Sequence, residues 1–191
     1  MSLRRGAARS LLFVAATGVF AGCCLMRSSN AIVWECRQEG LARMLLRDLN
    51  RAIDAYAKET GDETVTITSG RRSLRHQARL MAAFSQEQLM GMYGRNGTPG
   101  YIEAIGDLRQ EKQRDPTADE VYGILRTRES GFISSHLYGG AVDIASNSLQ
   151  DIPALRAQLA ACGFRTLDER SLGINCIHAT HTDVPKSIVR E

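Results

Sequence analysis

The stretch SSHLYGGAVDIA, residues 134–145, decides how the rest of the chain is interpreted. It is mostly apolar, yet it carries His136 near its start and Asp143 inside GAVDIA, a run typical of a buried strand. A buried carboxylate is costly unless a hydrogen-bond network or a metal ion pairs with it. Gly139 and Gly140 let the chain turn sharply between the two polar residues. The stretch therefore predicts either a hydrogen-bonded pair in the core or part of a metal site.

The composition is that of a soluble globular protein of one domain. The chain has 191 residues, of which 43% are hydrophobic and 24% are charged. Its net charge is only +3, and it has no long basic stripe with interleaved aromatic residues. We therefore expect no nucleic-acid partner.

The N-terminus differs from the rest of the chain. The basic segment MSLRRGAARS precedes the apolar segment LLFVAATGVFAG, which is the pattern of a secretory signal. The apolar run is shorter than the roughly 20 residues of a transmembrane helix. Cys23 follows Phe-Ala-Gly, which resembles a bacterial lipobox. We expect residues 1–30 to be a signal peptide or lipoprotein leader that exports the protein to the periplasm or cell envelope, with membrane contact only through this leader or a lipid on Cys23.

Residues 31–191 are predicted to form a single α+β domain. Apolar residues at helical spacing predict a helix over residues 37–59, ended by Gly61, and the alternating TVTIT predicts a strand over residues 64–68. Further helices are predicted over residues 73–84, 99–113, 116–127 and 151–161, and further strands over residues 140–145, 164–168 and 174–182. This order predicts a small, mostly antiparallel sheet flanked by helices, with a helical insertion at about residues 85–130.

Sequence signals also predict several element ends and one connection. Asp115 is the expected N-cap of the helix that begins at Pro116. Gly163 is the expected C-cap of the helix over residues 151–161. The last two strands are expected to form a hairpin around residues 169–173. Residues 91–100 are glycine-rich and are expected to form a loop.

Three cysteines belong to the domain, namely Cys36, Cys162 and Cys176. No pair has the CxxC spacing of a zinc knuckle. In an oxidising compartment two of the three can form a disulfide, and the alternative is that all are buried free thiols.

Histidines supply the remaining candidates for metal ligands. A catalytic zinc site takes three protein ligands and leaves one position for water. His136, Asp143 and one of the two C-terminal histidines, His178 or His181, would supply such a set if the last strand lies beside the strand of Asp143. A single histidine on an apolar strand is more often a hydrogen-bonded core residue, so the alternative is a metal-free α+β domain.

The central stretch resembles a known zinc-binding motif. SSHLYGGAVD fits the pattern S-x-H-x-x-G-x-A-x-D at Ser134, His136, Gly139, Ala141 and Asp143. This pattern is similar to the motif of the D-alanyl-D-alanine carboxypeptidase family, whose fold is shared with bacterial murein endopeptidases and the hedgehog signalling domain. The upstream ITSGRRS resembles the S-G-Y-R-S segment of that family. The resemblance covers roughly residues 60–85 and 130–185.

The resemblance implies a role for individual residues. His136 and Asp143 match the first two zinc ligands, and His178 in CIHA is the best match to the third, with His181 as its competitor. Arg72 matches an arginine that faces the substrate carboxylate, a task that suits a guanidinium. Ser134 would line the substrate site and orient it through hydrogen bonds behind the ligands.

The sequence departs from the family at the general base. An acidic residue commonly lies three positions before the last histidine, but here that residue is Asn175. If His178 is the ligand, the base comes from elsewhere, with His181 or Asp183 as candidates. If His181 is the ligand, His178 would be the base.

The resemblance implies zinc-dependent hydrolysis of peptide bonds in peptidoglycan stem peptides, by a carboxypeptidase or an endopeptidase. An exported protein would meet that polymer. The missing acidic residue favours an alternative, a non-catalytic module on the same fold that binds peptidoglycan or a protein.

Overall fold

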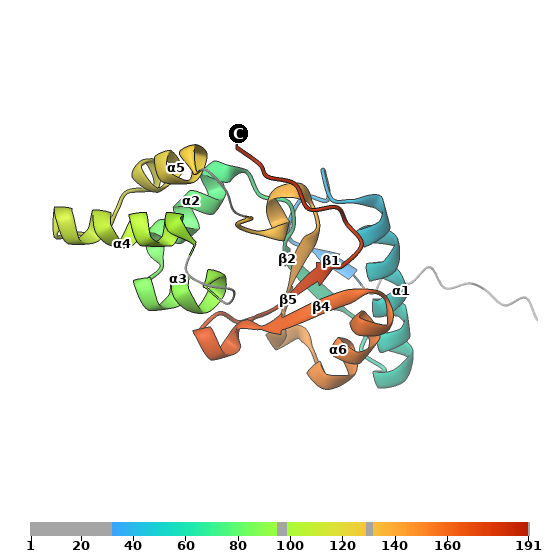
Figure 1. The fold of residues 1–191 in the computed structure, drawn as a ribbon. Coiled ribbons are helices and arrows are strands. Elements are labelled where there is room, and N and C mark those ends of the chain that lie inside the picture. The colour runs from blue at the N-terminus through green and yellow to red at the C-terminus, as the bar shows by residue number, and fades with distance from the viewer. Residues whose placement is uncertain (1–31, 95–98, 129–131, 191) are drawn as a thin grey trace, which may run out of the picture.

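The computed structural model describes residues 32–94, 99–128 and 132–190, which form six helices and a five-stranded mixed sheet (Figure 1). The strands are β1 (Ile32–Trp34), β2 (Val65–Ser69), β3 (Ala141–Ala145), β4 (Phe164–Asp168) and β5 (Cys176–His181). The helices are α1 (Arg43–Thr60), α2 (Leu74–Ala83), α3 (Gln86–Tyr93), α4 (Gly100–Lys112), α5 (Ala118–Thr127) and α6 (Ile152–Ala161). Short 3₁₀ turns cover Ser135–Tyr138, Ser146–Ser148 and Glu169–Leu172. The expected leader, residues 1–30, lies outside the described residues.

The sheet has the order β1-β2-β3-β5-β4. β1 runs parallel to β2, and the other neighbouring pairs are antiparallel. β3 lies at the centre, and all five of its residues are buried, as expected for a strand with AVDIA as its sequence. The predicted α+β class is therefore confirmed, and β4 and β5 form the predicted hairpin.

Two apolar cores divide the molecule. In the first, α1 and α6 pack on one face of the sheet through residues such as Leu45, Leu49 and Leu155. In the second, α2 to α5 pack on one another around residues such as Met81 and Ile105. Figure 1 shows the second group of helices beside the sheet, with α3 to α5 occupying the segment predicted as a helical insertion. Among the described residues, no helix has the length and apolar character needed to cross a membrane.

Several predicted boundaries are wrong. α1 begins at Arg43 rather than near residue 37, although Gly61 ends it in the left-handed conformation as expected. The N-cap of α5 is Thr117, which forms a capping box with Glu120, and not Asp115. The C-cap of α6 is Cys162, and Gly163 follows it with a φ of +84°.

The sequence did not predict β1 or α3, and the structure also distinguishes the disulfide from the free-thiol alternative for the cysteines. β1 adjoins the segment assigned to the leader, and α3 contains Gly91 within the segment assigned to a loop. Cys36, Cys162 and Cys176 are all free thiols, so no disulfide joins these three described cysteines.

Candidate metal centre

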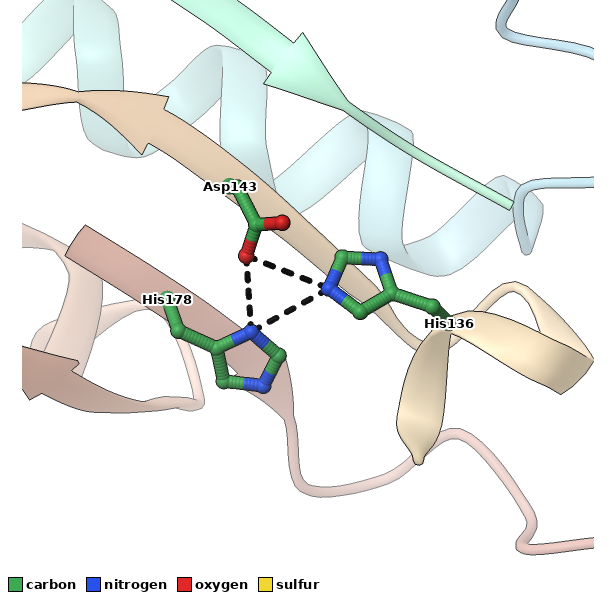
Figure 2. Close-up of side chains that lie close together, drawn as sticks. All are labelled: His136, Asp143 and His178. Carbon is green, nitrogen blue, oxygen red and sulfur yellow. Dashed lines mark hydrogen bonds and ion pairs between the residues drawn. The ribbon is translucent and has the colours of Figure 1, made fainter. Parts of the chain in front are cut away.

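Three side chains converge on one point from three separate segments (Figure 2). Nε2 of His136 lies 3.1 Å from Oδ1 of Asp143 and 3.2 Å from Nδ1 of His178. Nδ1 of His178 lies 2.8 Å from the same carboxylate oxygen. The sequence alone named His136, Asp143 and either His178 or His181, and the resemblance favoured His178 as the third ligand.

The local backbone explains why the three side chains meet. Asp143 on β3 pairs directly with His178 on β5, so the two residues share one face of the sheet. His136 lies in the 3₁₀ turn before β3, where the Ser134 hydroxyl accepts a hydrogen bond from the His136 N–H (3.3 Å). Gly139 ends that turn with a φ of +76°, which sends the chain back into β3.

The hydrogen bond behind His136 fixes which nitrogen faces the centre. Nδ1 lies 2.7 Å from the carbonyl oxygen of Gly70, which can only accept, so Nδ1 carries the proton and donates it. Burial lowers the pKa of His136, which is 1% exposed, and this favours the neutral ring. In this neutral tautomer Nε2 carries a lone pair and no proton, and it points at Oδ1 of Asp143.

His178 and Asp143 are held in a comparable way. Nε2 of His178 lies 2.9 Å from the Thr180 hydroxyl, which leaves Nδ1 directed at the centre. Burial raises the pKa of Asp143, but His136, His178 and Arg72 together hold it well below its usual value. Asp143 is therefore an anion, and the centre presents one negative charge and two imidazoles.

A tetrahedral zinc ion fits this donor set. Donor atoms about 2.0–2.1 Å from zinc at tetrahedral angles lie roughly 3.3 Å from one another. The three observed separations, from 2.8 to 3.2 Å, are close to that value. Without a cation the lone pair of His136 would face the carboxylate unfavourably, whereas a bound metal satisfies both. The carbonyl behind His136 matches the usual support of a metal-bound imidazole.

Arg72 lines the cleft, and part of its guanidinium is engaged by the protein itself. One of its Nη atoms donates to Oδ2 of Asp143, and its Nε donates to the Ser69 hydroxyl (3.0 Å). Its side chain is only 13% exposed. Arg72 therefore orients and neutralises Asp143, a candidate metal ligand.

His181 lies on the other face of the sheet. Residues three apart on a strand point to opposite faces, so β5 directs His178 to the centre and His181 toward α1. There Nε2 of His181 contacts Oδ2 of Asp48 (3.1 Å), and Nδ1 accepts a hydrogen bond from the Asp183 N–H (3.2 Å). Atoms of His181 border the cleft, but its buried ring is not brought to the metal centre. Asp183 follows β5 and is exposed.

Glu169 is the acidic residue that sequence reasoning missed. It begins the 3₁₀ turn between β4 and β5, and its Oε2 accepts a hydrogen bond from the Cys176 thiol (3.3 Å). Donor atoms of Asp143, Glu169 and Cys176 all lie within 4.8 Å of one another. Burial, followed by the charge of Asp143, raises the pKa of Glu169, and burial also raises the pKa of Cys176. No sequence signal marks Glu169, because its approach depends on how the hairpin turns.

The centre opens into a cleft of about 530 Å³. Both the three converging side chains and Glu169 line it. One wall is apolar and includes Phe84 and Tyr93 from the helical group and Phe132. The opposite wall comes from β4, β5 and the chain that follows β5. A volume of this size accommodates a few residues of an extended peptide.

Comparisons with protein-family models, with curated proteins and with solved structures found no match to this chain.

Proposed function

We propose that this protein is a zinc-dependent hydrolase of peptide bonds in bacterial cell-wall peptidoglycan. The observation that carries the proposal is the convergence of Nε2 of His136, Oδ1 of Asp143 and Nδ1 of His178 in an open cleft. Three ligands and an accessible fourth position are typical of catalytic zinc, whereas structural zinc sites are closed by four protein ligands. The cleft therefore favours catalysis.

The choice of substrate rests on the resemblance of SSHLYGGAVD to the motif of the D-alanyl-D-alanine carboxypeptidase family. We propose the fold of that family and peptidoglycan stem peptides as substrates. The signal-like N-terminal segment agrees with this choice, since an exported protein reaches the cell wall.

Residues around the centre have separate tasks in the proposed reaction. A zinc ion bound there would acidify a water molecule and polarise the scissile carbonyl. Glu169 can accept the proton of that water and return it to the leaving amine. It would thus take the role of the acidic residue that the family commonly has where this chain has Asn175. Gly70 and Thr180 keep the two imidazoles in orientation, and Arg72 does the same for Asp143.

Digestion of muropeptides tests the proposal. The full chain, loaded with zinc, is incubated with purified muropeptides, and the products are identified by mass spectrometry. We expect new fragments that a chelator abolishes and that the His136→Ala variant does not form. A protein that binds zinc and muropeptides without cleaving them would contradict the proposal and favour a non-catalytic binding module.

A further inference from the structure

Two cations that line the cleft have no ionic partner among the described residues. The side chain of Arg165 makes no ion pair or hydrogen bond with any residue in the described ranges. Lys186 contacts only an aromatic ring there, with its Nζ 5.3 Å from the centroid of Phe132. Arg72, the cation that the sequence assigned to the substrate, is already paired with Asp143. Arg165 and Lys186 are therefore the cations of the cleft that remain available to a ligand.

The register of the sheet places Arg165 near the metal centre. Leu167 on β4 pairs with His178 on β5, and Arg165 pairs with Thr180. Alternation along the strands puts Arg165 on the same face as His178. Arg165 lies two residues before Leu167 in β4, so its Cα lies about 7 Å along the strand from the pair Leu167–His178. A long flexible side chain spans that separation.

Lys186 lines the same cleft as Arg165. Thr180 and Thr182 also line it, and the chain then continues past the buried Val184 to Lys186. In Figure 1 this last segment turns back from the end of β5 toward the group of helices. Glu169 precedes β5 instead, so positive and negative side chains flank opposite ends of that strand. The cleft is therefore negatively charged near the start of β5 and positively charged near its end.

We propose that Arg165, assisted by Lys186, binds a free carboxylate of the peptide substrate next to the bond cleaved at the metal centre. This inference rests on the proposed function and deepens it. One residue of extended peptide spans about 3.3–3.6 Å, so a carboxylate at this position lies within one or two residues of the scissile bond. For a linear peptide that group is the C-terminus, and the preferred reaction is removal of a terminal residue. A planar guanidinium suits bidentate binding of a carboxylate.

Binding of a peptide acid and its amide tests the proposal. The probes are N-acetylated Lys-D-Ala-D-Ala with a free C-terminus and the same peptide as its C-terminal amide. Calorimetry is performed on the zinc-loaded full chain that carries Glu169→Gln to suppress cleavage. We expect the acid to bind more tightly, and Arg165→Gln to weaken its binding about tenfold to a hundredfold while leaving the amide unaffected. Lys186→Met should have a smaller effect in the same direction.

Arg126 offers a matched control, because it is exposed on α5 away from the cleft. Arg126→Gln should leave both affinities unchanged. Equal binding of acid and amide, binding of neither, or a preference that survives Arg165→Gln would overturn the proposal and leave Arg165 as a charge that protects an edge strand. Preferential binding of the acid that depends on Arg165, in a wild-type protein that cleaves nothing, would retain the carboxylate site and reject the hydrolase.

Discussion

Single hydrogen bonds determine what each histidine of the centre can do. The Gly70 carbonyl accepts a hydrogen bond from Nδ1–H of His136, and the Thr180 hydroxyl hydrogen-bonds with Nε2 of His178, so opposite ring nitrogens of the two histidines face the same point. Oδ1 of Asp143 completes the set, while Oδ2 is held by Arg72. The geometry of the centre thus depends on three residues that would not touch a metal, Gly70, Thr180 and Arg72, as much as on the three that would.

Glu169→Gln tests the general base. The amide keeps the shape of the side chain but cannot take a proton, so kcat for muropeptide hydrolysis should fall at least about a hundredfold. Zinc content, measured by mass spectrometry, should not change. As a control, Glu63→Gln removes an exposed carboxylate that does not line the cleft, and it should leave kcat unaltered. Unchanged kcat in Glu169→Gln would remove Glu169 from the mechanism.

Gly139→Ala tests the turn that presents His136. The residue has a φ of +76°, and an added Cβ would lie 2.0 Å from the carbonyl oxygen of Gly40. The left-handed backbone alone costs about 1–2 kcal/mol, and the clash must displace the turn as well. We expect a lower free energy of unfolding in urea and weaker zinc binding.

Gly123→Ala is the control for that substitution. Gly123 lies within α5, and an added Cβ would meet nothing within 4 Å. This variant should be neutral or more stable by up to about 1 kcal/mol, because alanine is the better helix former. A Gly139→Ala protein as stable as wild type would show that the turn tolerates a side chain.

Alternation along β5 separates two histidines that the sequence could not separate. His178 and His181 were both candidates for the third metal ligand. Because they lie three residues apart on β5, only His178, which pairs with Asp143, lies on the face of that carboxylate. His181 instead joins β5 to α1 through Asp48. Hydrogen bonding to Arg47 outweighs burial and, with His181, lowers the pKa of Asp48 to about 2.

Asp48→Asn should destabilise the packing of α1 on β5. Asp48 is 4% exposed, and the change weakens charge-assisted bonds to His181 and Arg47, so we expect a loss of about 1–3 kcal/mol in the free energy of unfolding. Asp54→Asn on the same helix is the control, since Asp54 makes no ion pair with any of the described residues, and this substitution should cost little stability.

The pH dependence of that difference has a definite sign. The folded pKa of Asp48 is about 2, below the value of about 3.9 in an unfolded chain. The stabilisation is thus complete above the unfolded value and is lost as the pH falls through about 2. Urea unfolding of wild type and Asp48→Asn should converge over this range, and a constant difference would contradict the assigned ion pair.

Much of the fold was predictable because its signals are local. The apolar periodicity of α1, the β-branched run of β2 and the buried run of β3 each specify an element without reference to the rest. β1 was not predicted, because three residues beside a leader carry no periodicity and gain their structure by pairing with β2. The Glu169 carboxylate was not predicted for a similar reason, since only the hairpin brings it to Asp143.

The two cores of the molecule account for the position of the site. The sheet with α1 and α6 supplies Asp143 and His178. His136 lies in the 3₁₀ turn before β3, flanked in the chain by Ile133 and Leu137, which belong to the helical core. The cleft forms where these two packed units meet, and each supplies one of its walls. A metal ion at the centre would therefore link the sheet to the segment that joins it to the helices.

Zinc content is the most direct measure of the central claim. The full chain and four variants, His136→Ala, His178→Ala, His181→Gln and His76→Ala, are purified, and bound zinc is measured by elemental mass spectrometry. We predict about one zinc ion per chain in wild type, its loss in the first two variants and its retention in the last two, because only His136 and His178 contribute to the converging donor set. Wild-type protein that binds no zinc after reconstitution, or zinc that is lost in His181→Gln but kept in His178→Ala, would contradict the site described.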